Sequence, residues 1–251
     1  MKKLRMVARI DVKNEFVIKG IHLEGLRKVG NPNELAKKYY ELGIDEILFM
    51  DVVASLYQRH NLFHIIEKAC EEVFIPITIG GGIRSISDID AALKSGADKI
   101  SINTQAIKTP SLITEASEKY GRQCVVGSIE AKRKSNHWEA YMDNGRESTG
   151  KDVVEWAKEL EKLGAGEILL TSIDQEGTKK GFDLALAKAV CDAVSIPVIA
   201  SGGIGKPLDV SKLCSQVDVD AVAIASLLHY EKNVPEDFKT ELHRHQIAVR
   251  L

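Results

Sequence analysis

The residues with the clearest chemical potential in this sequence are carboxylates that follow short apolar segments. Asp11 ends the apolar segment 4–11, and Glu130 ends the segment 123–130. Two carboxylates on opposite sides of a bound molecule can serve as a general acid and a general base, the pair that a ring closure or an elimination requires. A carboxylate at a strand end can instead simply cap the following loop, so this pair needs support from its surroundings.

Two glycine turns have the composition of phosphate-binding loops. The run GGG at 80–82 follows one apolar segment, and SGG at 201–203 follows another. Glycine lets backbone N–H groups approach an anion closely, and the start of a following helix adds a favourable dipole. The residues that we expect to bind phosphate are Gly81, Gly82, Asn103, Thr104, Ser201, Gly202, Gly203, Ala225 and Ser226. Two such cradles predict a long substrate with a phosphate at each end. The simpler alternative is two tight turns that need glycine only for backbone geometry.

The two glycine turns belong to a long internal repeat. VFIPITIGGGI at 73–83 is echoed by VSIPVIASGGI at 194–204, and 194 − 73 gives an offset of 121 residues. The same offset aligns 43–48 with 164–169. A repeat of this length is too long for a solenoid unit. We therefore predict two half-barrels, about 1–122 and 123–251, within one domain spanning 1–251.

The composition excludes several classes of protein. The 251 residues, 44% hydrophobic and 28% charged, are typical of one large globular domain. A net charge of −2 gives no overall field that favours nucleic acid or a membrane surface. No segment has the length of a signal peptide or a transmembrane span, and the four cysteines lack CxxC spacing, so we expect reduced thiols in a cytoplasmic protein. The seven histidines lack metal-ligand spacing, so no metal or cofactor is expected.

Short apolar segments alternate with longer amphipathic ones throughout the chain. Helices are expected to start at Asn33, Ser87, Ser111 and Lys151-Asp152, where small polar or acidic residues precede helical patterns. Most of the apolar segments are rich in isoleucine and valine, as strands buried on both faces require. The expected strands are 4–11, 46–51, 75–79, 99–103, 123–130, 167–172, 196–201 and 221–226.

This alternation predicts a (βα)8 barrel, an α/β fold in which eight parallel strands close into a ring. The alternative is an open, doubly wound sheet. The repeat argues against it, because two halves of four units each close symmetrically into a ring. In such a barrel the chemistry lies at the carboxyl ends of the strands, where Asp11, Glu130 and both glycine turns would be found.

Six motifs along the chain are distinctive when taken together. They are RIDVK at 9–13, IKG at 18–20, GGGI at 80–83, GADKISIN at 96–103, GAGEILLTSID at 164–174 and ASGG at 200–203. With these motifs the chain closely resembles one family, HisF, the cyclase subunit of imidazole glycerol phosphate synthase. The resemblance implies a lyase of histidine biosynthesis. The resemblance further implies that its bisphosphate substrate would be an N'-phosphoribulosyl formimino carboxamide ribonucleotide, which ammonia would convert into imidazole glycerol phosphate and aminoimidazole carboxamide ribonucleotide.

The resemblance also assigns roles to residues. It implies that Asp11 and position 130 are catalytic and that a glutaminase subunit, similar to HisH, docks on the N-terminal face of the barrel as a heterodimer partner. This chain has no Gly-x-Cys-x-Gly nucleophile motif with which to release ammonia itself. The family's charged ammonia gate, which can equally be a stabilising plug, would be formed by Arg5, Glu46, Lys99 and Glu167. Further substrate-binding residues would be Lys19, in a flexible loop, and Thr171, Glu176 and Gly177.

Three residues depart from the family pattern. Position 130 is Glu instead of Asp, which moves the carboxylate by about 1 Å, and a misplacement of that size can cost roughly 100-fold in rate. Arg9 replaces a small residue, and the period of two along a strand puts it on the same inward face as Asp11. A buried guanidinium needs a carboxylate partner, for which Glu130 and Asp51 are the candidates. Glu176 replaces an Asp.

These departures keep other functions open. They resemble a paralogous branch that passes ammonia to a sugar of bacterial surface polysaccharides, and the segments 22–27 and 54–62 favour the same branch. A further alternative is a non-catalytic barrel that binds phosphate and activates a glutaminase. An isomerase of the sister barrel family is less favoured, because Lys19 and the four gate residues fit the synthase better.

Overall fold

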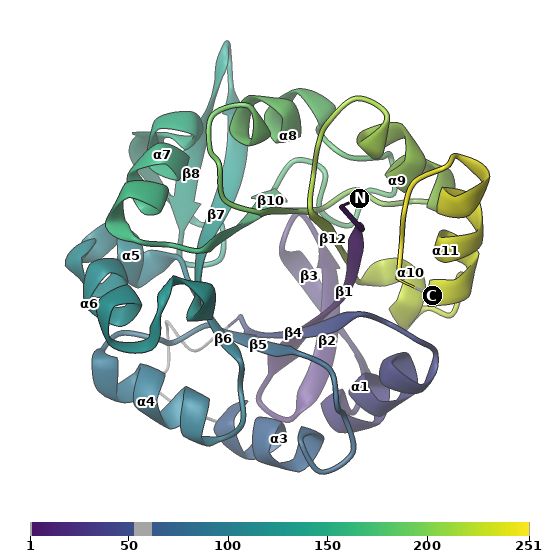
Figure 1. The fold of residues 1–251 in the computed structure, drawn as a ribbon, viewed down its shortest axis with the longest axis horizontal. Coiled ribbons are helices and arrows are strands. Elements are labelled where there is room, and N and C mark those ends of the chain that lie inside the picture. Colours follow the sequence, from purple (N-terminus) through teal and green to yellow (C-terminus); the bar gives the residue numbers. More distant parts are fainter. Residues whose placement is uncertain (1, 53–61, 251) are drawn as a thin grey trace.

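A computed structural model describes residues 2–52 and 62–250 and shows eight parallel strands closed into a ring (Figure 1). The strand order is β10-β11-β12-β1-β4-β5-β6-β7, and pairing of β7 with β10 completes the circle. This confirms the predicted (βα)8 barrel and excludes the open doubly wound sheet. The prediction of two half-barrels stays a prediction. The segment 54–62, apart from Leu62, lies outside the described residues.

The ring strands form where the sequence is apolar along its whole length, because helices cover one face and the barrel interior covers the other. All residues of β4, β10, β11 and β12 are buried. The bounds match the predicted segments to within a few residues. The ring strands are β1 (Arg5–Lys13), β4 (Glu46–Asp51), β5 (Ile77–Gly80), β6 (Lys99–Ile102), β7 (Val125–Lys134), β10 (Glu167–Ser172), β11 (Val198–Ser201) and β12 (Ala221–Ile224).

Helices surround the ring (Figure 1). They are α1 (Pro32–Glu41), α3 (Leu62–Ala69), α4 (Ile86–Lys94), α5 (Thr104–Lys108), α6 (Ser111–Tyr120), η1 (Arg122–Cys124), α7 (Val153–Leu163), α8 (Leu184–Cys191), α9 (Pro207–Cys214), α10 (Ser226–His229) and α11 (Pro235–Arg244). Each of them except η1, which has no buried residue, contributes buried apolar residues to the core around the strands. None of them, within 2–52 and 62–250, has the length and apolarity needed to cross a membrane.

Two of the predicted helix starts are wrong by two residues. The cap of α1 is Asn31, not Asn33, because Asn31 accepts hydrogen bonds from the amides of the next turn and Pro32 suits the first helical position. The cap of α4 is Ser85, not Ser87. The predicted starts of α6 and α7 are confirmed, with Asp152 capping α7.

Two antiparallel hairpins extend the ring at its carboxyl end, and the sequence analysis missed both. After β1 come β2 (Phe16–Ile21) and β3 (Glu24–Gly30), and after β7 come β8 (His137–Met142) and β9 (Glu147–Asp152). The hairpin of β7 and β8 projects beyond the helices (Figure 1). The segment expected to be a flexible loop around Lys19 is therefore a β-hairpin.

The inside of the ring is layered along the barrel axis. Val7, Leu48, Val126 and Leu169 form an apolar layer, together with Met50, Ile199, Ala221 and Ala223. β1, β4 and β10 begin with a charged residue that precedes this layer, and on β1, β7, β10 and β11 the layer is followed by polar or charged residues. The apolar layer therefore separates a charged floor at the N-terminal end from a polar mouth at the carboxyl end.

Candidate active site

The four predicted gate residues form a closed ring of ion pairs at the starts of β1, β4, β6 and β10. Arg5 contacts Glu46 at 2.7 Å and also pairs with Glu167. Lys99 contacts Glu46 at 3.1 Å and Glu167 at 2.9 Å. Each carboxylate therefore bridges both cations, and the four charges sum to zero. The glutamates are buried while Arg5 and Lys99 are partly exposed, so the ring closes the barrel floor and faces the N-terminal surface.

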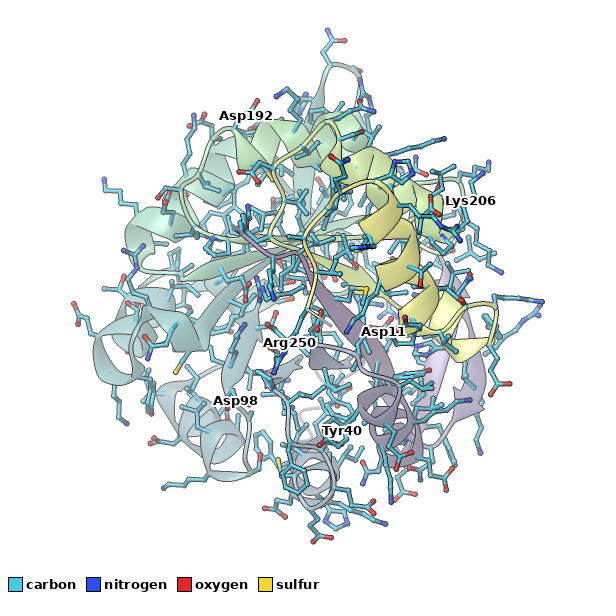
Figure 2. All side chains as sticks on the ribbon, turned by 45° about the vertical axis from the view of Figure 1, so that its right-hand side comes forward. Asp11, Tyr40, Asp98, Asp192, Lys206 and Arg250 are labelled. Carbon is cyan, nitrogen blue, oxygen red and sulfur yellow. The ribbon has the colours of Figure 1, made fainter. Side chains whose placement is uncertain are left out.

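At the mouth, Asp11 is buried between two cations. Its Oδ1 accepts a hydrogen bond of 2.8 Å from Nε of Arg9, and its Oδ2 lies 3.7 Å from Nζ of Lys19. Burial alone would raise the pKa of Asp11, but the charges of Arg9 and Lys19 outweigh it and hold the pKa below its usual value. Asp11 is therefore a fixed anion at neutral pH. It lies within the molecule, whereas Asp192 and Lys206 lie at its edge (Figure 2).

Arg9 points inward, as the alternation along β1 predicts, and its side chain is only 2% exposed. The carboxylate in its ion pair is Asp11, two residues further along the same face of β1. The sequence analysis named Glu130 or Asp51 and missed this pair, since the alternation gives the face of a side chain but not its rotamer. Burial alone would lower the pKa of Arg9, but the carboxylates of Asp11 and Glu176 outweigh it and raise the pKa, with a smaller contribution from Glu130.

Glu130 is held by neutral donors and behaves differently from Asp11. Its Oε2 accepts hydrogen bonds from Nδ2 of Asn103 at 3.0 Å and from the N–H group of Gly145 at 2.7 Å, and Asn103 also donates to the carbonyl of Tyr141. Burial, only partly offset by Arg9 and by the Gly145 amide, raises the pKa of Glu130 to about 7. Glu130 can therefore release and take up a proton near neutral pH.

The first glycine turn opens onto a cavity of about 120 Å³ beside Glu130. Gly81 and Gly82 have φ angles of +89° and +74°, and a Cβ atom on Gly81 would lie 2.1 Å from the carbonyl oxygen of Asp51. This turn therefore requires glycine for its backbone as well as for any anion. The predicted residues of this cradle lie together, and the lining also includes two cations that the sequence analysis missed. Among the lining residues are Gly81, Gly82, Asn103, Thr104, Arg84, Lys108 and Glu130.

The second glycine turn opens onto a narrower cavity of about 20 Å³. Gly202 and Gly203 have φ angles of +100° and +98°, and a Cβ atom on Gly203 would lie 2.0 Å from the carbonyl oxygen of Gly181. The predicted residues of this cradle also lie together, and Arg9 lines the same space. The lining residues include Arg9, Glu176, Gly177, Ser201, Gly202, Gly203, Ala225 and Ser226.

The hairpin of β2 and β3 is fastened beside the second cradle. Lys19 lies on β2, is 4% exposed and pairs with Glu176. The N–H group of His22 donates to the carbonyl of Glu176 at 2.8 Å. A Cβ atom on Gly177 would lie 2.5 Å from the carbonyl oxygen of Gly20. Lys19 is thus an internal partner of the two carboxylates of this region, rather than a solvated lysine in a mobile loop.

Both glycine turns and both carboxylates lie at one end of the barrel, because they follow parallel strands of the same ring. Gly145, which holds Glu130, was missed because it comes from the connection between β8 and β9. A local signal exists, since Asp143-Asn144-Gly145 is a strong hairpin turn sequence, and all three residues have positive φ angles.

The sequence is similar to known proteins of one family. A family model described as "Histidine biosynthesis protein" matches residues 5–234. A protein of Legionella pneumophila described as "Imidazole glycerol phosphate synthase subunit HisF" is 62% identical over 207 residues, which cover 82% of this chain and 98% of that protein. The chain belongs to the HisF family. HisF subunits of Lactococcus lactis subsp. cremoris (strain SK11) and Prochlorococcus marinus (strain MIT 9515) are 49% and 46% identical and cover 98% and 100% of this chain and 96% and 98% of their own lengths.

Within this HisF-family chain, the residues expected to depart from the family pattern cluster around one carboxylate. Arg9 and Lys19 flank Asp11, and Lys19 also pairs with Glu176. Glu130 lies within the electrostatic reach of both Arg9 and Asp11. The three departures at positions 9, 130 and 176 therefore belong to one electrostatic network at the mouth of the barrel.

Proposed function

We propose that this chain is the cyclase subunit of an imidazole glycerol phosphate synthase and acts in histidine biosynthesis. In this role it takes up ammonia from a glutaminase subunit and a phosphoribulosyl formimino carboxamide ribonucleotide. It releases imidazole glycerol phosphate and aminoimidazole carboxamide ribonucleotide. The observation that carries the proposal is the placement of two glycine cradles at the same barrel mouth as Asp11 and Glu130. A substrate with a phosphate at each end fits this arrangement.

Asp11 and Glu130 differ in pKa and therefore have different roles in the reaction. Condensation of ammonia with the substrate ketone expels water, and ring closure expels an amine, so both departing groups need a proton. Glu130, with a pKa of about 7, is the group that donates and recovers this proton. Asp11 remains an anion and stabilises the positive charge that develops on nitrogen during both steps.

The interior of the barrel supplies a route for ammonia. The route opens when an ion pair separates in the ring of Arg5, Glu46, Lys99 and Glu167. Ammonia then passes through the apolar layer above this ring. Neutral ammonia crosses such a layer at far lower cost than ammonium, because an ion loses its hydration there. The layer therefore delivers the reactive, unprotonated form to the mouth.

The N-terminal face has features that suit a glutaminase partner. Phe74, in the segment that precedes β5, is 75% exposed and packs edge-to-face against Tyr40. Leu42, in the segment that precedes β4, is exposed beside the same end of the barrel. An exposed aromatic residue on this face is a candidate anchor for a partner that feeds ammonia through the charged ring. We expect Phe74→Ser to weaken glutaminase binding by at least about tenfold. Phe16→Ser, at the opposite end of the barrel, should leave that affinity unchanged in titration calorimetry.

A different acceptor of ammonia, a sugar, is compatible with the same barrel, and the position of Arg9 favours it. Its guanidinium forms the inner wall of the second cradle and is paired with Asp11, so the mouth differs from the one that the family pattern implies. An ammonia-transfer subunit for a phosphorylated or nucleotide-linked sugar would keep the gate and the cradles and change this wall.

One experiment separates the functions. The purified chain is supplied with ammonium salt and the bisphosphate substrate, and imidazole glycerol phosphate is measured. Turnover supports the cyclase function. If the substrate binds but no product forms, the cyclase function is rejected. Substrate-dependent activation of the glutaminase then indicates the non-catalytic activator, and amination of a phospho-sugar indicates the sugar acceptor.

A further inference from the structure

Arg9 has an unusual combination of burial and hydrogen bonding. Its Nε donates to Asp11, and its Nη1 donates to Oγ1 of Thr171 at 2.9 Å and to Oγ of Ser201 at 3.3 Å. Thr171 and Ser201 are paired in register on β10 and β11. The guanidinium therefore crosses the inside of the barrel from β1 toward the second glycine turn, which follows β11.

The side chain keeps two donors for a ligand. A guanidinium has five N–H donors in a fixed planar fork. Nε uses one and Nη1 uses two, and no described residue accepts a hydrogen bond from Nη2. Arg9 also lines the narrow cavity at Ser201, Gly202 and Gly203, where an anion would meet the guanidinium directly. Burial of a cation with two unused donors is costly unless a further acceptor is supplied.

The negative charges beside the narrow cavity also favour a cation in its lining. Asp11 and Glu176 are both buried next to the cavity, and Lys19 lies between them, within 3.7 Å of Asp11 and paired with Glu176. A phosphate entering the second cradle adds two negative charges to this region. The backbone amides of the glycine turn are dipoles, whereas Arg9 is the full positive charge that lines this cavity.

We propose that Arg9 is a direct ligand of the phosphate group in the second cradle and that it fixes Asp11 relative to that phosphate. The inference rests on the proposed function, because the phosphate belongs to the substrate described there. Nη2 donates to the phosphoryl oxygens while Nε holds Asp11, so one planar side chain sets the separation between the phosphate and the catalytic anion. Arginine suits this task better than lysine, because its N–H donors are spread over a fixed planar fork, whereas the donors of lysine rotate about a single nitrogen atom.

Inorganic phosphate and glycerol phosphate are the probes, and ³¹P NMR titration of the full chain measures binding at both cradles. Arg9→Lys keeps the charge but removes the fork, and we expect it to weaken phosphate binding at the second cradle by at least about tenfold. Lys108→Ala, which changes the lining of the first cavity, should weaken only the first cradle. Thr171→Val removes an acceptor that orients the guanidinium without removing a charge, and should weaken the second cradle by about three- to tenfold.

If Arg9→Lys and Thr171→Val bind phosphate at the second cradle with the affinity of the unaltered chain, the role of Arg9 as a phosphate ligand is refuted. If Arg9→Lys does not fold, which a circular-dichroism melt reveals, Thr171→Val alone decides. If the unaltered chain binds phosphate at both cradles but forms no imidazole product, the proposed function fails. In that case the role of Arg9 stands or falls on the titration alone.

Discussion

Because Glu130 is buried, we predict that the unfolding free energy of the chain falls as the pH rises and Glu130 ionises. Burial, partly offset by Arg9 and the Gly145 amide, raises the pKa of Glu130 from 4.5 to about 7. The unfolded chain releases this proton near pH 4.5, whereas the folded chain holds it until about pH 7. Raising the pH through this window therefore favours the unfolded chain. Since each tenfold change in proton affinity corresponds to about 1.4 kcal/mol, the loss of folding free energy is about 3 kcal/mol.

Glu130→Gln removes this pH dependence with little change in shape. The amide oxygen of glutamine can accept the hydrogen bonds from Asn103 and Gly145, but the side chain does not ionise. We expect the unfolding free energy of the variant, minus that of the unaltered chain, to rise by about 3 kcal/mol between pH 4.5 and pH 8 in urea titrations. Glu159→Gln, at an exposed surface pair, should show no such trend. A difference for Glu130→Gln that stays constant across this range would refute a buried, neutral Glu130.

Asp11→Asn should abolish ammonia-dependent turnover while phosphate still binds both cradles, and near-full activity in a steady-state assay would remove Asp11 from the mechanism. Lys99→Ala should lower the unfolding free energy by about 1–3 kcal/mol in urea titrations, because it leaves two buried carboxylates short of a cation. Lys188→Ala, in an exposed pair, should change the unfolding free energy by less than about 1 kcal/mol. If Lys99→Ala and Lys188→Ala lowered the unfolding free energy equally, the closed ring would be contradicted. Gly203→Ala should eliminate phosphate binding at the second cradle, because its Cβ atom meets the carbonyl oxygen of Gly181. Unchanged affinity in ³¹P NMR would contradict this geometry.

The ring strands and the mouth were predictable because both depend on local patterns. Strands buried on both faces must be apolar along their length, so segments such as 46–51 and 167–172 stand out in the sequence. A parallel barrel then brings every strand end to one face, which is why Gly82 and Gly203 were correctly expected on the same side. The four residues of the floor ring were reached only through the family resemblance.

The features that were missed depend on contacts between distant segments or on short polar stretches. The hairpin that carries Lys19 has a charged and glycine-containing sequence that gives little strand signal, and its stability comes from docking against 173–177. The caps of α1 and α4 lie two residues before the predicted ones, because two polar residues compete within one turn. The partner of Arg9 depends on a rotamer, which alternation along a strand does not determine.

In the proposed site, two anion-binding turns flank Asp11 and Glu130 at one barrel mouth. A crystal structure of the full chain soaked in inorganic phosphate shows whether they do. We predict two phosphate ions, one at Gly81-Gly82 and one at Gly202-Gly203, on the same end of the barrel, with the two carboxylates between them and Nη2 of Arg9 within hydrogen-bond distance of the second ion. Phosphate at only one turn, or ions that do not face a shared space containing both carboxylates, would refute a site for a substrate with two phosphate groups.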